Sequence, residues 1–396
     1  MPKAHSGFHP GDAIALAREL IAVDSRNPSL VPDGPGEGAC ARMLASILDS
    51  WGFRTELQEA APGRPNVIAR IGTHGTPAAR SLILNGHLDT VGVDRMIHAP
   101  WDPDVRDGRL YGRGSADMKG GIAAMCAAAW RVSQESPGGV GGEVIVAAVV
   151  DEEFRSIGTS ALLNAGLRAD AAIITEPTQL AICTAHKGFA WADLEVRGVA
   201  AHGSRYDVGV DAIALAALVI AELEQYQQRV LTTRSHPLLG RPSVHASLIT
   251  GGTGLSTYPD RCTVQFERRT IPGESAADFT RELDDAVARV RTLRPDLNAT
   301  VVPGFAQQPN EVAESHRLVR LLAAAAADVG VPAPVEGLSC WTDAALFTAA
   351  GIPAICFGPG DIAVAHAVEE YAPVREIELA TDVLAGLIRR WFGGAT

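Results

Sequence analysis

The chain has 396 residues, with 34 Lys and Arg against 46 Asp and Glu, so its formal net charge is −12. This length exceeds the roughly 250–300 residues at which single hydrophobic cores usually divide, and it predicts two domains. A hydrophobic fraction of 47% with 20% charged residues excludes a largely disordered chain, and the acidic balance argues against nucleic-acid binding.

The first half of the chain alternates helices with strands. Helical spacing of apolar residues predicts helices over Gly11–Val23, Gly36–Trp51 and the alanine-rich Gly120–Val132, and a glycine-rich loop follows at Ser136–Gly142. Apolar runs of strand length occur at Asn66–Ile71, Ser81–Asn85, Glu143–Val150 and Ala171–Thr175. This alternation predicts an α/β domain with a mixed, mostly parallel sheet flanked by helices.

From about Phe189 to Val302 the pattern changes. Strands are predicted over Ala190–Arg197, Val244–Ile249, Cys262–Ile271 and Asn298–Val302, and helices over Val210–Val230 and Ser275–Leu293. The order β-α-β-β-α-β is that of a ferredoxin-like α+β unit. A helix over Glu311–Val329, a strand over Pro353–Phe357 and a helix over Glu376–Trp391 then resume the first pattern. We therefore predict one domain of residues 1–188 and 303–396, with a second domain, 189–302, inserted into it.

The sequence predicts a soluble, cytoplasmic protein that does not bind membranes. No apolar run approaches the roughly 18 residues of a membrane helix, the longest being Ile213–Ala221 and Val144–Val150. Residues Met1–Pro10 lack the apolar segment of a signal peptide. Six cysteines are scattered without a Cys-x-x-Cys pair, and we expect them to be buried free thiols.

Histidines and carboxylates gather where the predicted strands end. His87 and Asp89 follow the strand Ser81–Asn85, and the other candidates are Asp117 before the alanine-rich helix, Glu152 and Glu153, Glu176, and His366. In open α/β sheets, ligands bind beyond the carboxyl ends of the strands. Singly, each residue has a simpler explanation: a hydrogen-bonded histidine, a helix cap or a solvated acidic loop. Together, so many carboxylates at one edge would repel one another without cations.

Charge balance favours two divalent ions. If His87 and Glu176 bind one ion, Glu153 and His366 bind the other, and Asp117 bridges them with a hydroxide, four negative charges face two dications. Mixed nitrogen and oxygen ligands suit Zn²⁺ or Co²⁺ better than Mg²⁺ or Ca²⁺.

Two further residues beside the ligands have expected roles. Asp89 and His87 face the same way in an extended segment, so Asp89 is expected to hold the far imidazole nitrogen. Glu152, which is next to a ligand without being needed as one, is the expected general base for the bridging water.

The motifs around these residues resemble those of the M20 family of dinuclear zinc peptidases and deacylases. They are Asn85–Val91, Trp101-Asp102-Pro103, Tyr111–Gly121, Asp151-Glu152-Glu153, Thr175-Glu176-Pro177, Ala201-His202-Gly203-Ser204 and His366. The resemblance implies hydrolysis of an amide bond beside a carboxylate, with the same ligands, with Glu152 as base and with Asp89 in support. It also implies that 189–302 is a lid through which the protein forms a homodimer.

Several substrate contacts rest on the resemblance alone. His202 matches a lid histidine that reaches the neighbouring subunit's site and stabilises the oxyanion, and Arg269 resembles a lid arginine that grips the substrate carboxylate. Gly358 and Gly360 would offer backbone N–H donors to the same carboxylate. The plain alternatives are a loop histidine, a surface charge and a turn. Ser256 departs from the family pattern, because many members carry an asparagine there.

Three functions follow from these features. The favoured one is a metal-dependent hydrolase acting on an N-acyl amino acid or small peptide-like substrate. The alternatives are a metallocarboxypeptidase or dipeptidase with the same site, and a non-catalytic scaffold that binds metal and ligand. The intact Glu152 argues against the scaffold, because a binding module has no use for a general base.

Overall fold

The computed structural model describes residues 7–72, 80–135 and 141–393. The chain forms two compact units, unit 1 (Met1–Thr184, Val312–Glu336 and Thr342–Thr396) and unit 2 (Ala185–Glu311 and Gly337–Trp341). Unit 2 extends beyond the predicted insertion. The end of β8 (Ile182–His186) pairs with β13 (Asn310–Glu311), and both of these paired segments belong to unit 2. Most of the predicted glycine-rich loop, Ser136–Gly142, lies outside the described residues, and so do residues 1–6 at the N-terminus.

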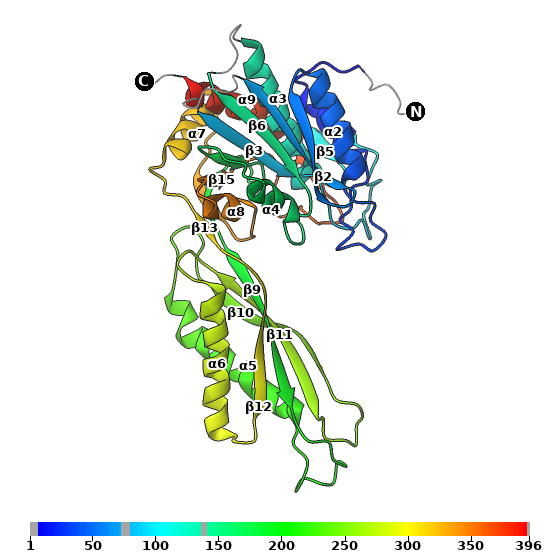
Figure 1. Cartoon of the computed structure of the whole chain (residues 1–396), viewed down its shortest axis with the longest axis vertical. Helices are drawn as coiled ribbons and strands as arrows, with labels where there is room; N and C mark the ends of the chain where they lie inside the picture. The colour runs from blue at the N-terminus through cyan, green and yellow to red at the C-terminus, as the bar shows by residue number, and fades with distance from the viewer. Residues whose placement is uncertain (1–6, 73–79, 136–140, 394–396) are drawn as a thin grey trace. The chain divides into compact units, whose positions relative to one another are not determined.

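Unit 1 is built on a mixed sheet in the order β1-β2-β6-β3-β7-β15-β8 (Figure 1). Its four central strands are parallel, as predicted: β6 (Glu143–Val149), β3 (Ser81–His87), β7 (Ala172–Ile174) and β15 (Ala354–Cys356). On the flanks, β1 (Arg54–Ala61) and β2 (Arg64–Gly72) run antiparallel at one side and β8 at the other. The short β14 (Val335–Leu338) also pairs with β8.

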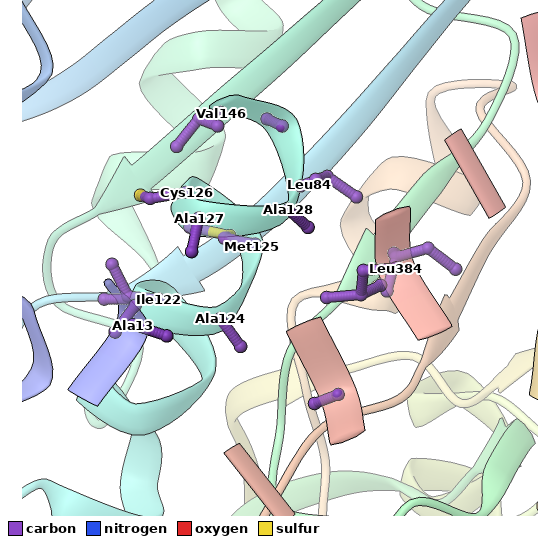
Figure 2. Close-up of a cluster of buried hydrophobic side chains, with 14 of the residues drawn as sticks. Ala13, Leu84, Ile122, Ala124, Met125, Cys126, Ala127, Ala128, Val146 and Leu384 are labelled. Atoms are coloured by element: carbon purple, nitrogen blue, oxygen red, sulfur yellow. The ribbon is translucent and has the colours of Figure 1, made fainter. Parts of the chain in front are cut away.

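Helices cover both faces of this sheet. One face shares a core with α1 (Ala13–Ile21), α2 (Gly38–Ser50), α3 (Gly120–Glu135), α7 (Arg317–Asp328) and α9 (Val374–Phe392). The short α4 (Ile157–Asn164) and α8 (Ala344–Ala349) lie in front of the sheet in Figure 1. The alanines of α3 are buried beside Leu84 of β3, Val146 of β6 and Leu384 of α9 (Figure 2). Small side chains allow α3 to be buried all round, which explains its apolar sequence.

A small second sheet joins two loops of unit 1. It has the order β16-β5-β4, formed by β16 (Tyr371–Pro373), β5 (Arg109–Tyr111) and β4 (Asp104–Arg106). Tyr111 and Tyr371 are paired in register, and a single π-helical turn, η1 (Ser115–Lys119), follows β5. The chain just before Asp117 is therefore tied to the chain just after His366.

Unit 2 has the predicted β-α-β-β-α-β order. Its elements are β9 (Gly188–Arg197), α5 (Ala212–Arg229), the 3₁₀ turn η2 (Leu231–Thr233), β10 (Ser243–Gly251), β11 (Arg261–Thr270), α6 (Ala276–Leu293) and β12 (Asn298–Gln307). The strands form an antiparallel sheet in the order β10-β11-β9-β12. Alternate residues of β9, such as Leu194 and Val196, pack into a core separate from that of unit 1.

Two element boundaries differ from the predictions. Strand β12 runs to Gln307, past the expected end at Val302, and its pairing with β9 shifts register between Pro303 and Ala306. The helix predicted from Glu311 begins instead at Arg317, because the His316 side chain accepts the N–H of Leu318 and caps it. No helix among the described residues is long and apolar enough to cross a membrane.

Candidate metal centre and active site

The parallel strands of unit 1 bring the predicted ligands to one edge of the sheet. His87 is the last residue of β3, Glu153 follows the end of β6, and Glu176 follows β7. Asp117 lies in η1, and His366 lies in the loop between β15 and β16. The carboxyl ends of parallel strands meet at a common edge, so residues far apart in sequence become neighbours here.

Five side chains form two overlapping triads. Asp117 belongs to both, and each triad has its potential ligand atoms within 4.8 Å of one another: His87, Asp117 and Glu176 in the first, and Asp117, Glu153 and His366 in the second. Asp117 Oδ1 lies 2.9 Å from His87 Nε2, and Asp117 Oδ2 lies 3.3 Å from His366 Nε2. His366 Nε2 is also 3.0 Å from Glu153 Oε1. Asp117 therefore offers one oxygen to each triad.

The donor set fits divalent cations. Glu176 is buried, and within the described part of the chain its Oε1 has no hydrogen-bond partner. A buried carboxylate oxygen without a partner is costly, and a cation would satisfy it. Imidazole nitrogens combined with carboxylate oxygens are ligands that suit Zn²⁺ and other transition metals.

The pKa values reflect crowded carboxylates. Burial, together with Glu176, raises the pKa of Glu152 well above its ordinary value, and burial with Asp117 raises that of Glu176. Hydrogen bonds to Asp117 and Glu153 raise the pKa of His366 to about 10. Burial opposes charge on His87, but its hydrogen bond to Asp117 prevails and raises its pKa. The raised pKa values of both histidines thus reflect an excess of negative charge, which divalent cations would neutralise.

Asp89 differs from the expectation in its contacts. The Nδ1 of His87 lies 3.0 Å from the backbone carbonyl of Asp89 and 3.6 Å from its carboxylate, so the carbonyl orients the ring. The carboxylate instead accepts the backbone N–H groups of Glu152 and Glu153, at 3.1 Å each, and Asn27 Nδ2 at 2.9 Å. Burial raises the pKa of Asp89 to about 7. Asp89 therefore positions the loop that carries the expected base.

A buried polar network behind this loop was not predicted. Arg64 pairs with Glu37 and, at 2.9 Å, with Asp151 Oδ1, which also accepts Asn27 Nδ2 at 3.1 Å. The backbone N–H of Asp151 donates a hydrogen bond to the carboxylate of Glu37. The network connects the segment around Asn27 and strand β2 to the loop of Glu152. The only sequence signal was the turn-like Asn27-Pro28, which does not indicate a polar partner.

Residues 83–390 match the sequence model of a protein family, Peptidase family M20/M25/M40. The chain belongs to this family. It is therefore a metal-dependent hydrolase of amide bonds. Acetylornithine deacetylase of Myxococcus xanthus is 33% identical over 392 residues, covering 96% of this chain and 97% of that protein. The N-formyl-4-amino-5-aminomethyl-2-methylpyrimidine deformylase of Bacillus subtilis is 27% identical over 418 residues, with 97% and 95% coverage.

Solved structures share the fold of this M20 protein. Aminopeptidase PepT of Bacillus cereus superposes with a TM-score of 0.80 at 20% identity, covering 97% of this chain and 99% of that one. The YXEP protein of Bacillus subtilis, a dinuclear metal binding peptidase from the M20 family, gives a TM-score of 0.74 at 15% identity, covering 97% and 98%. At these identities the likeness supports the two-part fold.

The predicted lid residues of this M20 protein lie in unit 2. His202 is exposed, and its Nδ1 lies 2.8 Å from Ser204 Oγ. Its loop is joined to that of Ser256, whose carbonyl accepts the N–H of Gly203 at 2.7 Å. Arg269 is half-buried and pairs with Glu267 at 2.7 Å. The roles of His202 and Arg269 towards the metal centre stay predictions.

The predicted contribution of Gly358 and Gly360 does not agree with their hydrogen bonds. The N–H of Gly358 donates to Thr178 Oγ1 at 3.1 Å, and that of Gly360 donates to Glu376 Oε2 at 2.8 Å. A Cβ at Gly358 would lie 2.5 Å from the carbonyl oxygen of Thr175. Gly358 is needed for close backbone packing beside Glu176, and in this structure neither N–H is free for a substrate carboxylate.

Proposed function

We propose that this M20 protein is a two-metal deacylase that releases the acyl group from an N-acyl amino acid or small peptide-like substrate. The observation that carries the proposal is the division of the Asp117 carboxylate between two triads of ligands. The names of two relatives, a deacetylase and a deformylase, favour acyl removal over cleavage between amino acids. A metallocarboxypeptidase or dipeptidase with the same ligands is the second candidate.

In this proposal, His87 and Glu176 would hold one cation, Glu153 and His366 would hold the other, and Asp117 would be a ligand in both triads. Zn²⁺ fits these donors best, and Co²⁺ is the alternative. When bound, such ions polarise the substrate carbonyl and lower the pKa of water.

The remaining chemistry belongs to the chain. Glu152 takes the proton of the attacking water and returns it to the leaving nitrogen, a task that its raised pKa suits. Asp89 keeps Glu152 in place through the backbone N–H of Glu152. His202 stabilises the charge that develops on the carbonyl oxygen, and Arg269 binds the carboxylate of the substrate.

Metal analysis combined with a substrate panel tests the proposal. We expect two divalent ions per chain and faster turnover of N-acetyl and N-formyl amino acids than of dipeptides. Faster turnover of dipeptides would favour the peptidase. Two bound metals without turnover of any substrate would indicate a scaffold, and no bound metal would contradict the whole proposal.

We also propose that unit 2 joins two chains into a homodimer. Its strand β10 lies at the edge of the sheet and exposes Leu248 and Ile249, at 63% and 54%. Helix α5, which contacts β10, exposes Leu218 at 40%. An edge strand with exposed apolar residues is a natural surface for pairing with a second copy.

Subunit mixing tests the dimer and His202 together. Glu152→Ala protein and His202→Ala protein are each expected to be inactive. If His202 acts on the neighbouring subunit, each mixed dimer has one intact site, and random exchange restores about a quarter of wild-type activity. No recovery, with exchange confirmed by mass, would contradict the role across the dimer.

The same proposal places the enzyme in the cytoplasm. Four of the cysteines, Cys40, Cys126, Cys183 and Cys262, are buried free thiols. Free cysteines are retained in reducing compartments, where disulfides are rare. Expression as a fusion to a redox-insensitive fluorescent protein, followed by fractionation, tests the location.

A further inference from the structure

Glu370 is a fully buried carboxylate that belongs to neither triad. Its Oε2 accepts Arg113 Nη1 at 2.6 Å and the backbone N–H of Gly114 at 3.0 Å. Its Oε1 accepts the backbone N–H groups of Ala116 at 3.0 Å and Asp117 at 3.2 Å. Four donors therefore converge on one carboxylate, which compensates the cost of burying its charge.

These donors come from the segment that leads into Asp117. Two pairs of neighbouring residues in that segment, Arg113 with Gly114 and Ala116 with Asp117, donate to Glu370. Gly114 adopts φ +81°, and a Cβ there would lie 2.8 Å from Thr90 Cγ2. The backbone from Arg113 to Asp117 is thus wrapped around the Glu370 carboxylate, and the position of Asp117 depends on it.

Glu370 also lies four residues after His366, on the same loop. Arg113 ties that loop further, because its Nη2 donates to the carbonyl of Ala367 at 3.4 Å. Its Nε donates to the carbonyl of Gly92 at 3.0 Å, in the loop that follows His87. The Arg113–Glu370 pair therefore connects the three loops that carry or follow Asp117, His366 and His87.

The charge of the pair also suits this place. Arg113 and Glu370 neutralise each other at 2.6 Å, and both side chains are at most 3% exposed. The pair adds no net charge to a cluster that already holds three carboxylates. An uncharged polar group at 370 would leave Arg113 buried without a counterion, and an amide NH₂ would face the backbone N–H donors.

We propose that Glu370, with Arg113, is a positioning residue that sets the distance between Asp117 and His366 and so the geometry of the metal centre. The inference rests on the proposed two-metal site. It assigns to Glu370 a role beyond stabilising the fold, since one of its hydrogen bonds is accepted from the backbone N–H of Asp117 itself. Partners of this kind, one step behind the ligands, typically change metal affinity or activity by 10–100-fold when removed.

The test replaces Glu370 by Gln and measures metal affinity by calorimetry and ligand geometry by the visible spectrum of the Co²⁺-loaded protein. We expect a loss of affinity of about 10–100-fold for at least one ion and a changed Co²⁺ spectrum. The matched control is Glu282→Gln in unit 2, because Glu282 also pairs with a buried arginine, Arg268, at 3.0 Å. This control should lose stability while keeping wild-type affinity and spectrum.

The outcomes separate this inference from the proposed function. If wild-type protein binds no divalent metal, the proposed function fails. If wild type binds two ions and Glu370→Gln matches it in affinity and spectrum, only the inference fails. Should Glu370→Gln not fold, Arg113→Lys decides: lysine keeps a charge for Glu370 but cannot also reach Gly92 and Ala367. Unchanged affinity and spectrum in Arg113→Lys would then overturn the inference.

Discussion

The ligand cluster of unit 1 and the core of unit 2 bury charged residues in opposite ways. In unit 2, the buried Arg268 pairs with Glu274 at 2.9 Å and Glu282 at 3.0 Å, and Arg234 contacts both glutamates, so the charges balance. In unit 1, the cluster holds three carboxylates and two histidines, and Glu176 Oε1 has no partner among the described residues. A balanced buried network stabilises a fold, whereas an unbalanced one indicates a missing cation.

Glu152→Gln should give the largest effect. Glu152 is the base in the proposed mechanism and is not a ligand, so kcat should fall at least ~10²-fold while both metals remain bound. Steady-state kinetics and metal analysis on the same preparation check this. Near-normal turnover would remove Glu152 from the mechanism. It would also weaken the contrast between a catalytic cluster in unit 1 and a structural network in unit 2.

Glu176→Gln should change stability with opposite signs in two conditions. Burial raises the pKa of Glu176 in the folded protein above its unfolded value, so near pH 7 the carboxyl group destabilises the metal-free fold. With a chelator, the Gln variant should therefore be more stable than wild type. With saturating metal the order should reverse, because ions that bind only the folded state stabilise wild type more. Thermal unfolding in both conditions measures the sign, and the same sign in both would contradict a ligand role.

His186 should give unit 2 a pH dependence that does not involve metal. Burial lowers the pKa of His186 to about 4, below its unfolded value near 6.5. The unfolded chain therefore binds the proton first, and stability falls as pH falls from about 6.5 towards 4, by up to ~3 kcal/mol. His186→Phe keeps a ring beside Trp341 without the titration, so its stability should fall less over this range. Urea unfolding with a chelator at several pH values compares the two, and parallel curves would refute the assignment.

Arg269→Ala should have the smallest effect of the four. If Arg269 binds the substrate carboxylate, its loss should raise KM about 10-fold, as expected for one charge-assisted contact, and leave metal content unchanged. Arg261→Ala, on the same strand but exposed, is the control and should behave like wild type. A loss of bound metal in Arg269→Ala would contradict the view that metal binding depends on unit 1 alone.

The sequence predicts the two-part fold well where periodicity is strong. Strands β3, β6 and β9 and helices α3, α5 and α6 lie where their apolar patterns place them. Strand β1 was missed because it lies at the sheet edge and none of its residues is buried, so it lacks an alternation of buried apolar and exposed polar residues. The end of β12 was missed because Pro303 and Gly304 disfavour a strand, and pairing with β9 overrides that preference.

The candidate site was predictable in its ligands and less so in its supports. Three of the candidate ligands, His87, Glu153 and Glu176, lie at or just after strand ends, which the sequence reveals, and the topology of a parallel sheet brings such ends together. The supporting residues Glu370, Arg64 and Glu37 make hydrogen bonds to backbone groups and to other side chains. No rule of sequence spacing connects Arg113 with Glu370, which lies 257 positions away. The hydrogen bonds of Gly358 and Gly360 likewise depend on side chains of distant segments, Thr178 and Glu376.

Unit 2 interrupts the chain between Glu176 and His366, yet among the described residues it contributes nothing to the ligand triads. Its core is also its own. Substitutions in unit 2 outside such residues as His202 and Arg269 can therefore accumulate without disturbing the ligand triads. Such a division lets evolution alter which amide is cleaved while the means of cleaving it persist. It offers a physical reason why proteins related to this chain carry names as different as deacetylase and deformylase.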